Sequence, residues 1–361
     1  MLRSMYSGIS GMKANQVKLD VIGNNIANVS TTGFKSSSAR FTDMLYQNMS
    51  SATAPTGQKG GTNAKQVGLG AQLASINKVM GQGNALSTGR SLDVCIDGDG
   101  YLIVGSGNTS YGGADGTEGG NPIDGNQGLG SGGNMDILYT RDGNLTLDHE
   151  GNLITADGYR VMGYYLTGTD ADGNVINSVG VDADGNSIAN FVDADGKPKA
   201  IGAEDGNVKL QPLVIPDKVV TGKTDDGKDI TQPVKSFSIG KDGVITAVLG
   251  DGSRTALGQV AMASFKNPEG LTSVGGNLLQ SSPNSGEVII KTPTGGIGPD
   301  DNNIDNSKGF GDFIQGALEA SNVDLTEQFT DMITATRAFQ ASSKMISTAD
   351  EILQTITGLM R

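Results

Sequence analysis

The sequence predicts an α+β protein in which a long helix at each end of the chain flanks a mainly β middle. Three observations support this class: a seven-residue apolar repeat near each terminus, a period-two alternation between them, and an abundance of glycine. The chain has 361 residues, of which 55 are glycine and none is tryptophan, and only 5% are aromatic. This composition favours many turns and short strands over one large aromatic core.

An N-terminal helix is predicted from apolar residues that recur every seven positions. The repeat consists of Met5, Met12, Leu19 and Ile26, and Ile9 lies on nearly the same face. A strict seven-residue apolar repeat is typical of a helix that packs along another helix with a slight supercoil. We therefore expect these five side chains to face a partner helix.

A longer C-terminal helix carries the same period. Its repeat consists of Leu325, Met332, Phe339, Ile346 and Leu353. Asp324 and Glu327 form the pattern of a capping box at its start. A helix of about 36 residues would be ~54 Å long, longer than a small domain is wide. It needs a partner, and the only comparable predicted helix is at the other end of the chain.

The charges of the two ends are complementary. Residues 1–40 contain five basic residues and one acidic residue, whereas residues 312–361 contain seven acidic and three basic residues. Opposite charge favours pairing of the two ends. The second seam, four residues after the repeat, is polar and contains Thr336, Ser343, Asp350 and Thr357. We therefore expect loose, coiled-coil-like packing among several neighbours rather than an isolated two-stranded coil.

The middle of the chain alternates with the period of strands. Apolar residues alternate with others over 67–73 and 92–97, and short apolar runs meet Asp-Gly and Gly-Asn turns over 137–165 and 237–265. These patterns predict a series of β-hairpins. The predicted domains are an N-terminal helix with its connecting segment (1–66), a discontinuous β domain (67–169 and 235–295), a small inserted outer β domain (170–234), and a linker with the C-terminal helix (296–361).

Bulk properties exclude several classes of protein. The net charge of −13 argues against non-specific nucleic-acid binding. No apolar run approaches the ~20 residues needed for membrane insertion, and the N-terminus lacks the apolar region and cleavage site of a cleaved signal peptide. The single cysteine, Cys95, cannot form an internal disulfide. It alternates with apolar neighbours, which predicts a small packed side chain or, alternatively, a residue at a subunit contact.

No catalytic or cofactor site is predicted. Asp-Gly repeats at 170, 182 and 193 invite comparison with calcium loops, but aligning their glycines leaves no acidic residue at the first or twelfth position. Tight hairpin turns explain these repeats better. The only histidine, His149, has no nucleophile beside it, and no acidic pair is placed for hydrolysis. We expect a protein that is not an enzyme and that holds no metal or cofactor.

One polar stretch near the N-terminus carries a family signature. The segment LDVIGNNIANVSTTGFKS (19–36) closely resembles the signature of the bacterial flagellar rod and hook proteins, and segments at 67–76, 87–104, 139–164 and 317–354 resemble the same family in its order. The signature residues are Asn24, Asn25, Asn28, Thr32, Gly33 and Phe34. We expect Gly33 to provide a left-handed helix cap and Phe34 to anchor the turn.

The resemblance implies an architecture and a set of partners. In that family both terminal helices form an inner tube around an export channel, with the β domains outside. The resemblance therefore implies that the repeat residues of both helices serve self-assembly: Met5, Ile9, Met12, Leu19, Ile26, Leu325, Met332, Phe339, Ile346 and Leu353. The implied partners are copies of the same chain, the distal rod protein, the hook cap, the hook–filament junction proteins and the flagellar type III export apparatus. Export by that apparatus would place the protein in the hook, outside the cell, without a cleaved signal peptide.

Two features resemble the hook-forming members more than the distal rod members. They are DLTEQFTDMITATRAFQ (324–340) and the insertion after Tyr165. They predict a curved hollow tube that acts as a universal joint and transmits torque from the rod to the filament. Two alternatives remain: a distal rod protein, which is a straight drive shaft, and a calcium-binding secreted adhesin.

Overall fold

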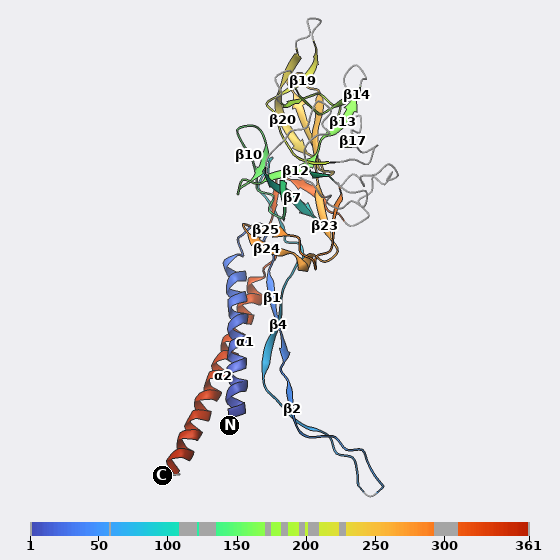
Figure 1. Cartoon of the computed structure of the whole chain (residues 1–361). Coiled ribbons are helices and arrows are strands. Elements are labelled where there is room, and N and C mark those ends of the chain that lie inside the picture. The colour runs from blue at the N-terminus through green and yellow to red at the C-terminus, as the bar shows by residue number, and fades with distance from the viewer. Residues whose placement is uncertain are drawn as a thin grey trace. The chain divides into compact units, whose positions relative to one another are not determined.

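The computed structural model confirms the α+β class, with a mainly β chain and a long helix near each end (Figure 1). Its contacts divide the chain into two units. Unit 1 comprises Met1–Ser30, Lys35–Gly81 and Asn322–Arg361, and unit 2 comprises Thr31–Phe34 and Gln82–Ser321. The structure describes residues 2–57, 59–107, 121–122, 135–169, 175–181, 187–194, 199–200, 209–223, 229–291 and 310–359.

Unit 1 combines the two helices with four strands. Its elements are α1 (Leu2–Ala27), β1 (Ser37–Asp43), β2 (Tyr46–Ser50), β3 (Lys65–Gly68), β4 (Ala71–Lys78) and α2 (Leu325–Leu359). Strand β1 pairs antiparallel with β4, and β2 pairs antiparallel with β3. Helix α1 contacts α2 as well as β1 and β4. Asp324 caps α2, because its Oδ1 accepts from the backbone N–H groups of Thr326 at 2.8 Å and Glu327 at 3.4 Å.

The two helices run alongside each other in opposite directions (Figure 1). Lys18 Nζ lies 3.2 Å from Asp331 Oδ1, while Gly8, nearer the start of α1, lies beside Ile346. A side chain at Gly8 would come within 3.1 Å of Ile346 Cγ1. Glycine therefore lets the two helices approach closely at this crossing.

The second seam of α2 differs from the predicted one. Positions Ser343, Asp350 and Thr357 are exposed. The buried positions lie three residues after the repeat instead, at Ala335 and Ala349, which are 2% and 7% exposed. Small side chains permit the close approach of α1, and this close approach selects the seam with the smaller residues.

Unit 2 is built almost wholly from short strands. They are β5 (Ala85–Ser87), β6 (Val94–Asp97), β7 (Tyr101–Gly107), β8 (Asn121–Pro122), β9 (Met135–Thr140), β10 (Leu145–Leu147), β11 (Leu153–Thr155), β12 (Arg160–Tyr164), β13 (Leu166–Thr169), β14 (Val175–Asn177), β15 (Val179–Val181), β16 (Ser187–Ala189), β17 (Lys199–Ala200), β18 (Lys209–Pro212), β19 (Lys218–Lys223), β20 (Asp229–Ile239), β21 (Val244–Leu249), β22 (Arg254–Val260), β23 (Met262–Phe265), β24 (Thr272–Gly275), β25 (Leu278–Gln280), β26 (Val288–Lys291), β27 (Asp312–Gln315) and β28 (Ala317–Glu319), with a 3₁₀ helix η1 (Pro268–Gly270).

A large antiparallel sheet organises unit 2. Its main path runs β19-β20-β21-β22-β12-β7-β9-β25-β24. The predicted Asp-Gly turns join consecutive strands: Gly243, between β20 and β21, has φ +77°, and Gly252, between β21 and β22, has φ +91°. Glycine adopts these left-handed conformations without strain. Turn chemistry thus accounts for this part of the glycine excess.

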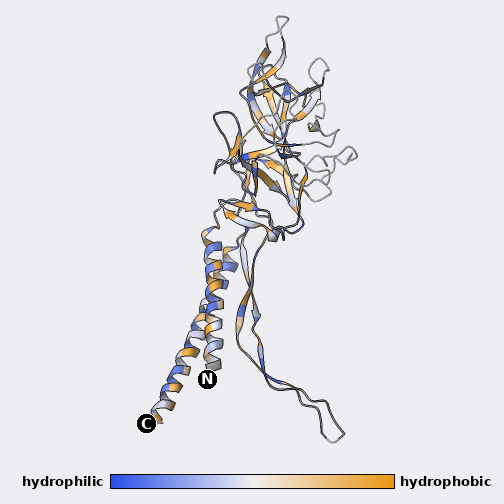
Figure 2. Cartoon of the chain, viewed as in Figure 1, coloured by the Kyte–Doolittle hydropathy of each residue, from blue (hydrophilic) through white to orange (hydrophobic). Residues whose placement is uncertain are grey.

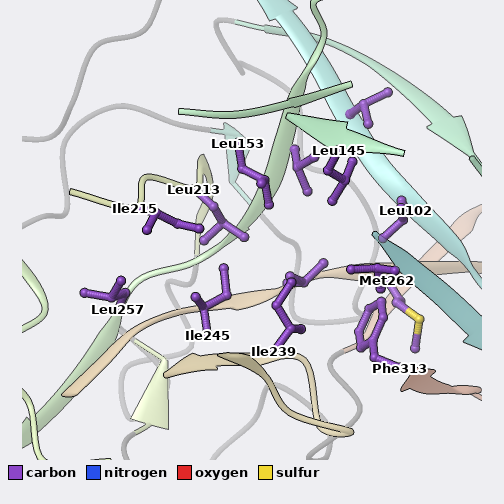
Figure 3. Close-up of a cluster of buried hydrophobic side chains, with 14 of the residues drawn as sticks. Leu102, Leu145, Leu153, Leu213, Ile215, Ile239, Ile245, Leu257, Met262 and Phe313 are labelled. Carbon is purple, nitrogen blue, oxygen red and sulfur yellow. The ribbon is translucent and has the colours of Figure 1, made fainter. Parts of the chain in front are cut away.

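The core of unit 2 is a cluster of aliphatic side chains contributed by many strands. Figure 3 shows Leu153, Leu213, Ile245 and Phe313 converging within it, and each is at most 2% exposed. Apolar burial on this scale contributes strongly to the stability of unit 2.

Strands from residues 170–234 do not all pair among themselves. Strand β18 pairs with β12 and β19 pairs with β20, so both join the large sheet. Small separate sheets form from β13, β14 and β17 and from β15 with β16. An inserted domain of residues 170–234 stays a prediction. Its Asp-Gly repeats lie largely outside the described residues.

Neither helix, over its described residues, combines the length and the apolar character required to cross a membrane.

Replacement of Leu153 by alanine tests the core of unit 2. Leu153 is 0% exposed, so Leu153→Ala should lower the free energy of unfolding of unit 2 by about 2–5 kcal/mol through lost burial and a residual cavity. Leu86 is 60% exposed, and Leu86→Ala should lower it by less than about 1 kcal/mol. Urea unfolding of the full chain, followed by circular dichroism of the strands, measures both. Equal losses would contradict the proposed position of the core.

Candidate functional site

Exposed apolar side chains are the main functional feature of unit 1. Figure 2 shows hydrophobic residues distributed along both helices. Large apolar side chains with at least 36% exposure occur on α1 (Tyr6, Ile9), on the strand segment (Phe41, Leu45, Tyr46, Met49, Val67, Leu73, Ile76, Val79) and on α2 (Leu325, Phe329, Ile333, Met345, Ile352, Ile356, Leu359). Large apolar side chains exposed in this number on one unit favour a protein–protein contact over a solvent-facing surface.

An apolar groove lies between α1 and the strand segment of unit 1. Its volume is about 600 Å³, and its walls are formed by Tyr6, Ile9, Ser10, Lys13, Ala14, Val17, Met44, Leu69, Ala71, Gln72 and Leu73. Gly70 lies so close to Ser10 that a side chain at this glycine would overlap the serine. The two walls therefore meet at this point, and the groove opens beyond it.

The predicted assembly residues fall into two groups. Met5, Met12, Leu19, Ile26, Met332, Phe339, Ile346 and Leu353 are partly buried, whereas Ile9 and Leu325 are 37% and 39% exposed. Ile346 lies beside Gly8 of α1, and α2 residues spaced seven apart from Ile346 share its helix face. That face of α2 is therefore turned towards α1. Ile9 instead lines the groove.

The signature asparagines form hydrogen bonds at the end of α1. Asn25 is 1% exposed, and its Nδ2 donates to Ser37 O at 2.8 Å and to Gln328 Oε1 at 3.0 Å, while its Oδ1 accepts from Ser37 N at 2.9 Å. It therefore links α1 to β1 and α2. Asn28 Nδ2 donates to Asn24 O at 2.9 Å and to Asn24 Oδ1 at 2.7 Å in the last turn of α1.

The remaining signature residues belong to unit 2. Thr32 Oγ1 donates to Asp142 Oδ1 at 2.9 Å, and Asn277 Nδ2 donates to Thr32 O at 3.0 Å. The Gly33 N–H donates to Glu319 O at 2.8 Å. Phe34 is partly buried, and its N–H donates to Thr31 O at 3.4 Å within the turn.

The predicted role of Gly33 as a helix cap is wrong. Gly33 has φ +67°, as expected, but α1 already ends at Ala27. A side chain at Gly33 would come within 2.9 Å of Asp142 N and 3.0 Å of Arg141 C. The left-handed conformation therefore serves a close approach to the backbone of Arg141 and Asp142 in the same unit, instead of a helix end.

A buried ion pair in unit 2 was missed by the sequence analysis. Arg141 Nη1 lies 3.2 Å from Glu319 Oε2, and the two side chains are only 5% and 1% exposed. Arg141 Nη2 also donates to Gly98 O at 2.7 Å, and its guanidinium lies 5.3 Å from the centre of the Tyr101 ring. A charged residue directly after one short strand and another at the end of a second strand were the available signal, but nothing in the sequence indicated that the two pair across 178 residues.

The electrostatics of this pair extend to Tyr101. Burial raises the pKa of the Tyr101 hydroxyl above its ordinary value, the positive charge of Arg141 opposes that rise, and the carboxylates of Asp99 and Glu319 add to it. Removing one member of a buried ion pair typically destabilises a protein by about 3–5 kcal/mol, since the other charge remains buried. The pair therefore fixes the local structure strongly.

Cys95 lies within unit 2, on β6, and is 0% exposed. Its neighbours Val94 and Ile96 are each 2% exposed, so the predicted alternation does not separate a buried face from an exposed one. Strand β27 pairs with β6 and places Ile314 opposite Cys95. A subunit contact through this thiol would require that strand pair to open.

Alanine at Gly33 tests the close approach to unit 2. Gly33→Ala should destabilise unit 2 by about 2 kcal/mol or more, because it adds a steric clash to the strain of a positive φ. Gly89 is a matched control, with φ +68° and open space around it. Gly89→Ala should show the strain alone, about 1 kcal/mol. Thermal unfolding of the full chain compares them, and equal shifts would exclude a role for the contact.

Comparison with known proteins identifies the family. Family models match three parts of the chain: "Flagella basal body rod protein" at residues 5–35, "Flagellar hook protein FlgE/F/G D1 domain" at residues 130–247, and "Flagellar basal body rod FlgEFG protein C-terminal" at residues 314–359. The chain is 37% identical to the flagellar basal-body rod protein FlgG of Bacillus subtilis, and the alignment covers 100% of both chains. It is 31% identical to the flagellar hook protein FlgE of Borreliella burgdorferi, over 99% of this chain and 100% of the relative.

A solved structure, the Helicobacter pylori flagellar hook protein FlgE2, matches with 11% identity and a TM-score of 0.37, over 65% of this chain and 100% of the other. This likeness is too weak to support any inference. The two full-length relatives establish the family, and one is named a rod protein and the other a hook protein. The chain belongs to the flagellar rod and hook protein family, whose members are structural subunits of the flagellum and not enzymes.

Proposed function

We propose that this chain is the subunit of the flagellar hook, and that it polymerises into a curved hollow tube that transmits torque from the rod to the filament. The observation that carries polymerisation is the exposed apolar surface of unit 1, which includes Leu45 at 82%, Ile333 at 61% and Leu359 at 82% exposure. Burying a large apolar side chain stabilises an assembly by roughly 1.5–3 kcal/mol. Contacts with further copies cover this surface in the polymer.

The terminal helices form the inner tube in this proposal. The α1–α2 pair is the repeating element, and its coiled-coil-like face is made by the partly buried heptad residues of both helices. The outer flank of α2 and the groove face of α1, with Ile9, then meet neighbouring copies. Unit 2 forms the outer layer, and residues 170–234 form its outermost part. The central channel lies inside the ring of helices.

Bending of the tube follows from weak helix–helix seams. The helices are long, but the second seam of α2 predicted from the sequence is partly polar and contains Thr336, Ser343, Asp350 and Thr357. Neighbouring helices can therefore shift slightly along their axes as the tube rotates. The net charge of −13 favours outer contacts that are polar and individually weak.

The choice of hook over rod rests on sequence features. Residues 324–340 and the insertion after Tyr165 resemble hook-forming members, and the hook relative aligns over its entire length. The proposed partners are the distal rod protein, the hook cap, the hook–filament junction proteins and the flagellar type III export apparatus. The proposed location is the hook, outside the cell.

A distal rod protein is the second candidate. The supporting observation is the 37% identity to a relative named as a basal-body rod protein, with 100% of both chains aligned. In that case the same inner tube would form a straight, stiff drive shaft rather than a flexible joint.

Charge placed on the exposed flank of α2 tests polymerisation. Ile352 and Ile356 are 51% and 41% exposed, one helical turn apart. We expect Ile352→Asp with Ile356→Asp to reduce sedimentable polymer at least tenfold, because carboxylates would be buried between copies. The control Ser347→Asp with Thr348→Asp changes exposed polar positions of the same helix. Polymer yield equal to the control would exclude this flank from the contact.

Electron microscopy of basal bodies from a strain lacking this protein separates hook from rod. The hook proposal predicts complete rods without a curved extension. Rods that end short of their normal length would favour the distal rod candidate. Restoring the gene should restore the missing segment in either case.

A further inference from the structure

The chain passes between the two units at four peptide bonds. In each unit, one polar residue forms hydrogen bonds to other segments that cross. The crossings lie at Ser30–Thr31, Phe34–Lys35, Gly81–Gln82 and Ser321–Asn322. We propose that Glu319 in unit 2 and Asn322 in unit 1 act as a pair of ties at three of these crossings, Phe34–Lys35, Gly81–Gln82 and Ser321–Asn322, each tie fastening the segments on its own side to one another.

Glu319 binds both of the other crossing segments of unit 2. Its Oε1 accepts from the Gly83 N–H at 2.9 Å, two residues after one crossing. Its backbone oxygen accepts from the Gly33 N–H at 2.8 Å, inside the segment that crosses twice. Glu319 itself lies two residues before the last crossing. One residue therefore contacts every segment through which unit 2 receives or returns the chain.

Arg141 fixes the position of this carboxylate. Its guanidinium pairs with Glu319 Oε2 at 3.2 Å and is held in turn by Gly98 O at 2.7 Å. The Glu319 side chain is 1% exposed, so water cannot replace the arginine. The backbone of Arg141 also lies close to Gly33, because a side chain at Gly33 would come within 3.0 Å of Arg141 C. The ion pair is thus placed to hold all three segments at once, and Arg141 is a positioning residue.

Asn322 is the corresponding tie in unit 1, where it binds two other crossing segments. Its Oδ1 accepts from the Ser36 N–H at 2.7 Å, and its Nδ2 donates to Val79 O at 2.7 Å and Gly81 O at 3.2 Å. Lys35 Nζ also donates to Gly81 O at 2.9 Å, and the Val79 N–H donates to Ser36 O at 2.7 Å. The crossings at Phe34–Lys35, Gly81–Gln82 and Ser321–Asn322 are thus fastened on both sides, whereas these bonds do not include the segment that ends at Ser30.

The ties leave very short connectors between them. Phe34 and Lys35 separate the tied residues of the first segment, Gln82 alone separates those of the second, and Ala320 and Ser321 separate those of the third. Connectors of one or two residues leave only a few φ and ψ angles free to vary between the tied residues. Transmission of torque through them rests on the proposed function.

Hydrogen exchange of the full, unpolymerised chain tests the tie in unit 2. Glu319→Ala removes the acceptor of the Gly83 amide but keeps the backbone acceptor of the Gly33 amide. If Glu319 ties the segments together, both amides should exchange at least tenfold faster, while the core amide of Leu153, which donates to Leu213 O, should change less than twofold. Glu269→Ala, an exposed carboxylate of unit 2, is the matched control.

Faster exchange at Gly83 with unchanged exchange at Gly33 would overturn the proposal, because the two bonds would then be independent. If Glu319→Ala unfolds unit 2, Glu319→Gln decides. Glutamine keeps an acceptor for Gly83 but loses the charge paired with Arg141, so both amides should still accelerate together, by a smaller factor. Acceleration of neither amide, or of one alone, would exclude the tie.

The tie in unit 1 has an equivalent test. Asn322→Ala removes the acceptor of the Ser36 amide, whereas the Val79 amide keeps its backbone acceptor. Both should exchange at least tenfold faster, and Asn48→Ala, at an exposed asparagine, should change neither. Independent behaviour of the two amides would refute this tie.

The mechanical role is measured separately, in cells. If the ties carry torque, cells with Glu319→Gln should assemble the structure but swim at less than half the normal speed. Normal swimming despite accelerated exchange would refute the mechanical role alone. Absence of polymer with an unmodified chain would instead contradict the proposed function, and the exchange experiments need no polymer.

Discussion

The rest of the structure depends on one constraint: unit 1 has a large apolar surface that the described residues of the chain leave exposed. Helix α2 has 35 residues, yet among its described positions only Ala335 and Ala349 are buried. A helix gains most of its stability in a protein from packing one face against a partner. Here one face meets α1 while a second, carrying Ile333 and Ile352, remains exposed. Under the proposed function, further copies of the chain supply the missing contacts on this exposed face.

Unit 2 is stabilised differently from unit 1. Its aliphatic core is closed within the chain, and its buried charges are paired, as with Arg141 and Glu319. It can thus remain folded while unit 1 gains or loses neighbours. This division assigns assembly to the helices and the long strand segment, and it assigns shape and surface to the β unit. Hydrogen bonds of the short crossing segments are concentrated at Glu319 in unit 2 and at Asn322 in unit 1.

The sequence predicted those features that depend on local periodicity. Heptads identified both helices, and Asp-Gly turns identified the hairpins, because each pattern reflects contacts between residues near in sequence. Features set by distant contacts were not accessible. The second seam of α2 depends on alanine and glycine, which an apolar repeat does not count. Strands β1 to β4 join the helices, although residues 67–73 resemble any other strand. The pairing of Arg141 with Glu319 spans 178 residues, and the role of Gly33 depends on a backbone that packs against it.

Hydrogen exchange of α2 in the dilute monomer and in the polymer tests the central claim most directly. The account predicts that amides of α2 exchange rapidly in the dilute chain and become at least a hundredfold more protected on polymerisation, while amides of the large sheet in unit 2 are equally protected in both states. An α2 that is already as protected in the isolated chain as in the polymer would contradict it, since the helices would then owe nothing to their neighbours.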